Sequence, residues 1–104
     1  MKIFKKNTTI PIHRNYKFGW HSTHRDNVYS LKQSHSSMFL LGDSIIKGLS
    51  RYKKVWKNLF NQYEAINGGI GGDKTQNVLW RVQNMSLPPS IKCVVINVGI
   101  NNID

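Results

Sequence analysis

The chain has 104 residues, of which 39% are hydrophobic, and 15 Lys or Arg residues against 5 Asp or Glu give it a formal net charge of +10 at pH 7. This length allows one small domain with one core, and the hydrophobic content argues against disorder along the whole chain. No apolar stretch approaches the ~20 residues that span a bilayer, and the basic start lacks the ~7 to 15 residue apolar region of a secretory signal. We therefore expect a soluble, cytoplasmic protein of a single domain.

The positive charge is spread over the chain, because residues 1–37 hold seven basic residues and one acid, and residues 38–104 hold eight and four. Such an excess attracts polyanions such as nucleic acid or acidic membranes. No zinc-ligand set, heptad series or RNA-binding signature accompanies it. The sequence thus indicates at most weak polyanion binding through the basic amino-terminal part.

Residues 1–37 show apolar residues at no sustained helix or strand period. We predict an irregular basic arm here, either anchored to the body by aromatic residues such as Phe18 and Trp20 or detached from it. The composition changes at Ser36 and Ser37, so the folded unit is expected to span residues 38–104.

Strands and helices alternate from Met38 onward. Short apolar runs predict strands at 38–41, 64–67 and 91–98, and helical spacing of apolar residues predicts helices at 45–59, interrupted near Gly48 or Tyr52, and at 75–86. The residues expected to face the core are Ile45, Leu49, Tyr52, Trp56 and Leu59 in the first helix and Val78, Leu79, Val82 and Met85 in the second. Cys93, the only cysteine, is expected to be a buried thiol, and it excludes an intrachain disulfide.

This order of elements predicts an α/β protein with a parallel sheet, in which the loops after the strands gather in one crevice. Three motifs fall in those loops: Gly42-Asp43-Ser44, Gly71-Gly72-Asp73 and Gly99-Ile100-Asn101-Asn102. A hydroxyl at a strand-to-helix junction is suited to act as a nucleophile. The N–H groups of Ser44 and Gly72 and the carboxamide of Asn101 are suited to stabilise an oxyanion beside it. Together they predict acyl transfer.

Each motif also has a simpler interpretation. Asp43-Ser44 could be only a helix N-cap. The glycines of 68–72 could form a flexible turn or a phosphate-binding loop, although the Lys-Ser/Thr ending of a Walker loop is missing. Asn101-Asn102 could only terminate a strand. Their common place at one sheet edge favours the catalytic interpretation.

The three motifs, in this order, resemble the first three conserved blocks of the SGNH (GDSL-like) hydrolase superfamily. Within it, residues 69–81 and 94–102 look like the catalytic α subunits of platelet-activating-factor acetylhydrolase. The resemblance implies a flavodoxin-like parallel sheet with flanking helices, truncated after the third strand. It also implies that Ser44 is the nucleophile, that Ser44, Gly72 and Asn101 form the oxyanion hole, and that Asp43 supports the nucleophile loop. It implies a small acyl or acetyl ester as substrate and no metal or cofactor.

Two departures from the family are visible. Ile100 replaces a frequent Thr, and the Asp-x-x-His block that supplies the catalytic acid and base is absent, while all four histidines precede Ser44. The sequence therefore leaves open an amino-terminal portion of an ester hydrolase, an inactive fragment, and a basic polyanion-binding module. An uncovered sheet edge would also favour self-association into a homo-oligomer.

Overall fold

A parallel three-stranded sheet forms the centre of the computed structural model, which describes residues 10–14 and 17–103. The strands are β1 (Met38–Gly42), β2 (Ile66–Gly69) and β3 (Cys93–Asn97), in the spatial order β2-β1-β3. Expectations for residues 1–9 and for Asp104 lie outside the described residues. The sheet with its flanking helices confirms the α/β, flavodoxin-like fold class.

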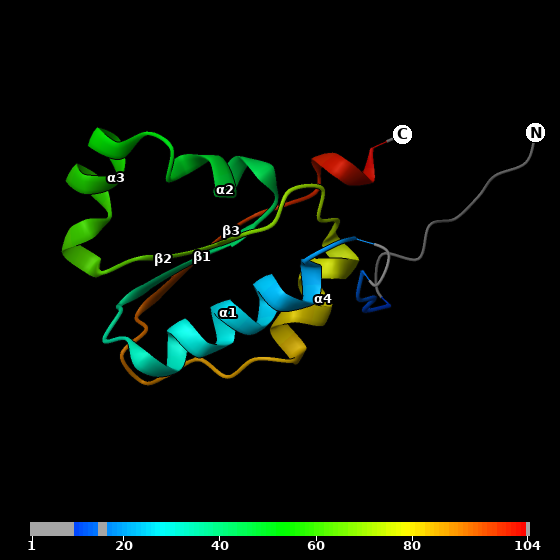
Figure 1. Cartoon of the computed structure of the whole chain (residues 1–104), viewed down its shortest axis with the longest axis horizontal. Helices are drawn as coiled ribbons and strands as arrows, with labels where there is room; N and C mark the ends of the chain where they lie inside the picture. The colour runs from blue at the N-terminus through cyan, green and yellow to red at the C-terminus, as the bar shows by residue number, and fades with distance from the viewer. Residues whose placement is uncertain (1–9, 15–16, 104) are drawn as a thin grey trace, which may run out of the picture.

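Helices cover the sheet from both sides (Figure 1). One side carries α2 (Ser44–Leu49) and α3 (Lys53–Leu59), and the other carries α1 (Trp20–Gln33) and α4 (Thr75–Gln83). Two short 3₁₀ helices, η1 (Asn61–Tyr63) and η2 (Ile100–Asn102), complete the described elements.

The core lies under the central strand. Phe39 and Leu41 of β1 pack with Leu31 of α1 and Val78 of α4, and all four side chains are buried. Pairing on both edges and helices on both faces explain why β1 is an unbroken apolar run.

Helix α1 corrects the prediction that residues 1–37 are irregular. Its buried residues are Trp20, His24, Asn27 and Leu31, which recur at helical spacing, but two of them are polar. An apolar pattern therefore cannot reveal this face. Trp20 anchors the segment to the body as expected, whereas Phe18 is fully exposed.

The predicted interruption of the first helix is confirmed between Leu49 and Lys53. Within α2 the buried residue is Ile46, while Ile45 is 53% exposed. After the break, α3 buries none of its residues. The expected apolar stripe is therefore wrong.

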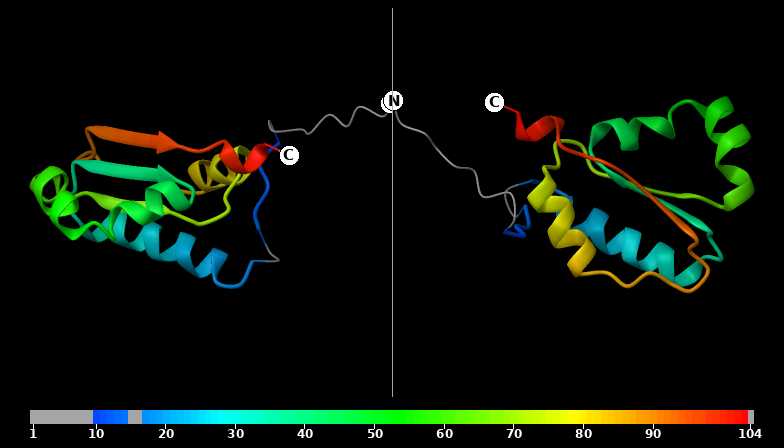
Figure 2. Two further views of the ribbon diagram at one scale, coloured as in Figure 1. Left: turned by 90° about the horizontal axis from the view of Figure 1, so that it is seen from above. Right: turned by 180° about the vertical axis from the view of Figure 1, so that it is seen from behind.

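Two further expectations about burial are wrong. In α4 the prediction of Val78 as a core residue is confirmed, but Val82 is exposed. The neighbouring Arg81 is completely buried instead. In β3 every residue is exposed, Cys93 included. The strand lies at an edge of the sheet (Figure 2), and unlike β2 at the other edge it packs mainly against β1 rather than against helices.

Candidate active site

The loops that follow the three strands begin side by side at one edge of the sheet. Gly42, at the end of β1, lies opposite Gly69 of β2 and Asn97 of β3 in the strand register. Beyond the strands, the N–H of Ile70 donates to the carbonyl of Gly42 at 3.0 Å, and the N–H of Asp43 donates to the carbonyl of Asn97 at 3.3 Å. The common edge expected from a parallel sheet is therefore formed.

The candidate nucleophile loop, residues 42–44, turns sharply because Gly42 has no side chain. A Cβ atom there would lie 2.0 Å from the carbonyl oxygen of Asn97, so no other residue fits without a shift of the backbone. The buried carboxylate of Asp43 caps α2 by accepting a hydrogen bond from the N–H of Ile45 at 2.9 Å. Ser44 itself is exposed, and its N–H donates to no acceptor among the described residues.

The glycine loop, residues 68–72, passes next to this serine. A Cβ atom on Gly71 would lie 3.9 Å from the Cβ of Ser44. Gly72 has a φ of +82°, a left-handed conformation that favours glycine. Within residues 10–14 and 17–103, the N–H of Gly72 also has no acceptor.

The asparagine loop, residues 99–102, is connected by side-chain hydrogen bonds to Asp73, just after the glycine loop, and to the start of α4. Asn101 donates from Nδ2 to the carbonyl of Asp73 at 3.0 Å, which leaves the second N–H of this amide available. Asn102 accepts from the N–H of Thr75 at 2.9 Å and donates to Oε1 of Gln76 at 2.9 Å. Ser44, Gly72 and Asn101 are thus brought to one end of the molecule.

The carboxylate of Asp73 is the centre of a buried network that the sequence did not reveal. It accepts from Nε1 of Trp20 at 2.8 Å, from Arg14 at 3.0 Å and from Arg81 at 3.3 Å. The Asp73 and Arg81 side chains are completely buried. Burial lowers the pKa of Arg81, and the negative charge of Asp73 opposes this shift. The network joins the segment before α1, α1 and α4 beneath the glycine loop.

The four histidines lie away from the candidate nucleophile. His13, His21 and His24 pack around Trp80, and His35 precedes β1, at the end of the strand opposite to Ser44. Burial, followed by the charge of Arg81, lowers the pKa of His24. No described histidine contacts Ser44, so none of them is placed to remove its proton.

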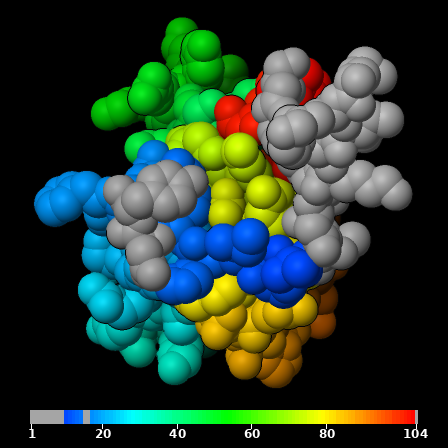
Figure 3. Space-filling model, turned by 90° about the vertical axis from the view of Figure 1, so that its right-hand side faces the viewer, coloured from blue at the N-terminus to red at the C-terminus, as the bar shows by residue number. Residues whose placement is uncertain are grey.

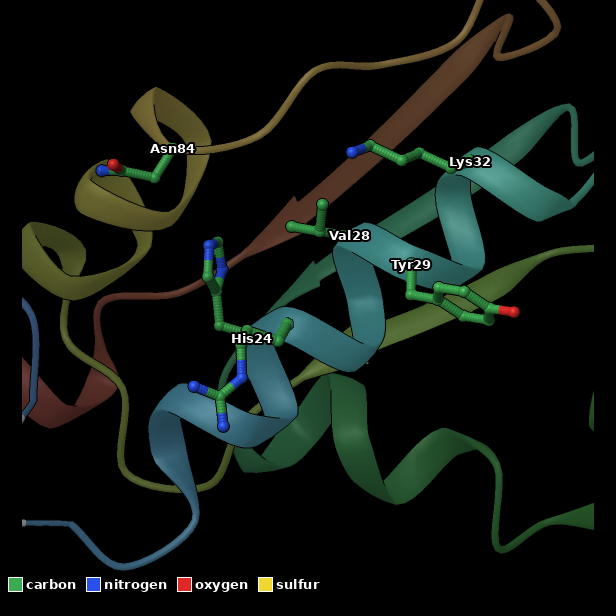
Figure 4. A pocket seen from close by; sticks show the side chains of 6 residues that line it. His24, Val28, Tyr29, Lys32 and Asn84 are labelled. Carbon is green, nitrogen blue, oxygen red and sulfur yellow. The ribbon is translucent and has the colours of Figure 1, made fainter.

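Two of the hollows that lie away from Ser44 are lined by core elements of the fold. One, of about 340 Å³, lies between α1 and α4 and is lined by side chains shown in Figure 4: His24, Arg25, Val28, Tyr29, Lys32 and Asn84. The other, of about 490 Å³, is apolar and opens beside β3, with a lining of Phe39, Leu41, Val82, Met85, Leu87, Val94 and Ile96.

In the described part of the chain, no group of three or more His, Cys, Asp or Glu side chains is arranged to hold a metal ion. Among the same residues, none of the helices has both the length and the apolar character needed to cross a bilayer.

The fold and the loops define a protein of the parallel α/β class whose candidate site lies at the carboxyl edge of the sheet. No protein-family model matches the chain. The chain is 38% identical over 84 residues to platelet-activating factor acetylhydrolase IB subunit alpha2 of Homo sapiens, and 40% identical over 84 residues to subunit alpha1 of Rattus norvegicus. On this similarity the chain belongs to the SGNH hydrolase superfamily that its motifs resemble.

Each match covers 80% of this chain, and the chain spans 36% of the length of these relatives. Because residues 38–104 are fewer than the matched 84, the similarity must also include part of the region upstream of β1. The homologous region is therefore larger than the folded unit expected from composition.

Proposed function

We propose that the chain carries the nucleophile and the oxyanion hole of a serine ester hydrolase of the SGNH type, which acts on small acyl esters such as acetyl esters. Oγ of Ser44 attacks the carbonyl carbon of the ester, the alcohol leaves with a proton, and water then releases the acyl group as a carboxylic acid. The N–H groups of Ser44 and Gly72 and Nδ2 of Asn101 bind the oxyanion, while Asp43 supports the loop as the cap of α2.

The proposal is supported by the position of Ser44, Gly72 and Asn101 in loops that follow three different strands at one edge of the sheet. Ser44 and Gly72 have backbone N–H groups without an acceptor in the described chain, and Asn101 keeps one free amide hydrogen. The printed names of the relatives add the reaction class, because both are acetylhydrolases. An acetyl ester is therefore the first substrate to test.

The reaction needs a base for the hydroxyl proton of Ser44, and no described histidine is placed to act as one. Imidazole added to the buffer can act as this base. We therefore expect p-nitrophenyl acetate to acetylate the full chain on Ser44 more rapidly as the imidazole concentration rises. Intact mass spectrometry measures the acetyl-enzyme.

Ser44→Ala should abolish this acetylation. Ser50→Ala is the matched control, because Ser50 is another exposed serine at the end of the same helix and its hydroxyl only donates to the carbonyl of Lys47. Equal acetylation of the wild type and the Ser44→Ala variant would refute the proposed function.

The alternatives are an inactive fragment and a basic polyanion-binding module. The second has less support upstream of α1, since Arg14 and Lys17 already donate to the carbonyl of Gly71. A binding role predicts an affinity for single-stranded DNA that falls steeply between ~50 and ~200 mM salt and is the same in Ser44→Ala. The ester hydrolase that we propose instead predicts that acetylation is lost in Ser44→Ala.

A further inference from the structure

We propose that Lys17 and Arg14 are positioning residues of the oxyanion hole, which hold the peptide between Gly71 and Gly72 so that the N–H of Gly72 points into the space beside Ser44. This inference rests on the proposed function. Both residues belong to the leading segment, defined here as residues 10–14 and 17–19, which precedes α1. Figure 3 shows the dark blue part of this segment across the yellow residues of α4, close to the yellow-green glycine loop.

The contacts converge on one carbonyl group. Nζ of Lys17 donates to the oxygen of Gly71 at 2.6 Å, and Nη1 of Arg14 donates to the same oxygen at 3.1 Å. Two cationic donors on a single carbonyl oxygen make short, charge-assisted hydrogen bonds, which fix its direction more firmly than neutral donors do.

Peptide geometry carries this constraint to the next residue. The peptide bond is planar, and none among residues 10–14 and 17–103 is cis, so the N–H of Gly72 points opposite to the carbonyl of Gly71. With that carbonyl directed at the leading segment, the N–H is directed away from it. The N–H finds no acceptor among the described residues, as required of a donor kept for a ligand.

The glycine loop needs such an external hold. Residues 68–72 contain four glycines, which lose more conformational freedom on ordering than other residues and have no side chains to fix them. Arg14 packs against this loop closely, because a Cβ atom on Gly72 would lie 3.2 Å from its guanidinium nitrogens. The positive charges also polarise the Gly71–Gly72 peptide, which strengthens its N–H as a donor.

The leading segment is itself held in place on both sides of these contacts. The N–H of Ile12 donates to the carbonyl of Gln76 at 3.0 Å, and Nδ2 of Asn77 donates to the carbonyl of Ile12 at 2.8 Å. Arg14 also pairs with the buried Asp73, and Trp20 donates to the same carboxylate. The donors on Gly71 are thus fixed to α4 and α1.

Lys17→Met is the sharpest test, because Arg14 has a second, structural role at Asp73. We expect imidazole-assisted acetylation to slow by roughly 10-fold at saturating ester, without a change in the ester concentration at half-maximal rate. The decrease in rate should stay below the ~10² to 10³-fold loss that follows complete removal of an oxyanion donor, because Lys17→Met only misplaces the N–H of Gly72. Lys17→Arg should restore the rate, since a guanidinium can also donate to the carbonyl of Gly71. Lys92→Met is the control, because Lys92 also donates to a backbone carbonyl, that of Pro89, but lies just before β3, at the end of the strand opposite to the candidate site.

A spectroscopic measurement tests the positioning without any turnover. The amide proton of Gly72 in a ¹⁵N-labelled chain should shift in Lys17→Met, return in Lys17→Arg and stay unchanged in Lys92→Met. If its resonance and the acetylation rate of Lys17→Met both match those of Lys92→Met, the positioning role is wrong. Unchanged acetylation in Ser44→Ala instead refutes the proposed function and leaves the Gly72 resonance to decide whether Lys17 positions this peptide.

Discussion

The two strands that flank β1 differ in how the rest of the chain covers them. On one side, β2 contacts helices on both faces of the sheet and its last two residues are buried. On the other side, all of β3 is exposed, and its ordering rests on pairing with β1 and on the asparagine hydrogen bonds beyond its end. The candidate site combines loops from both strands. The glycine loop follows the covered strand β2, and the asparagine loop follows the exposed strand β3.

The largest effect should come from the supported side. Asp73→Asn leaves the guanidinium of Arg81 buried without its counter-ion, so we expect a loss of about 3–5 kcal/mol in the free energy of unfolding. Urea denaturation measures this loss. Asp26→Asn, which changes an exposed acid of α1, should alter stability little. If the two variants have the same midpoint, the network does not support the loop.

The asparagine loop provides a kinetic test. Asn101→Ala should slow imidazole-assisted acetylation by about 10² to 10³-fold if Asn101 is the oxyanion donor that we propose. Asn102→Ala removes the acceptor of the Thr75 N–H, so it should mainly lower stability, by about 1 kcal/mol. Rate and urea measurements on both variants separate the two roles. Similar rates in the two variants would contradict the assignment of Asn101.

Matched truncations on neighbouring strands sharpen the contrast in burial. Leu41 and Ile96 are register partners, but Leu41 is 1% exposed and Ile96 is 57% exposed. Leu41→Ala should cost about 2–5 kcal/mol in stability, and Ile96→Ala less than about 1 kcal/mol. Urea midpoints measure both. An equal loss would mean that β3 is covered in solution, for example by a second copy of the chain, and the oligomeric state would then be measured by ultracentrifugation.

The smallest effect concerns pH. Burial lowers the pKa of His24 below its ordinary value of 6.5, so the folded state keeps this ring neutral while the unfolded state takes up a proton as the pH falls through 6.5. Stability is therefore retained above that pH and falls below it, with a slope of at most about 1.4 kcal/mol per pH unit. His24→Phe should reduce the slope measured in urea between pH 5 and 7.5, whereas His35→Gln, an exposed histidine, should not.

Periodicity and motif spacing predicted much of the architecture. The parallel sheet, the helix interruption after Leu49 and the position of the three loop motifs follow from short-range patterns of apolar residues and glycines. Helix α1 could not be found in this way, because His24 and Asn27 occupy its buried face beside Trp20 and Leu31. The environment of Arg81 was likewise hidden, since a charged residue on a helix is normally expected in solvent.

By itself, the sequence determined which segments become strands and where chemically useful residues follow them, because those features depend on neighbours within a few positions of the chain. The tertiary structure alone decided that Asp73 gathers Trp20, Arg14 and Arg81, and that β3 and Cys93 remain exposed. These outcomes depend on contacts between segments up to about sixty residues apart. No local pattern encodes such contacts, because burial of a charge or exposure of a strand is settled only when distant surfaces meet.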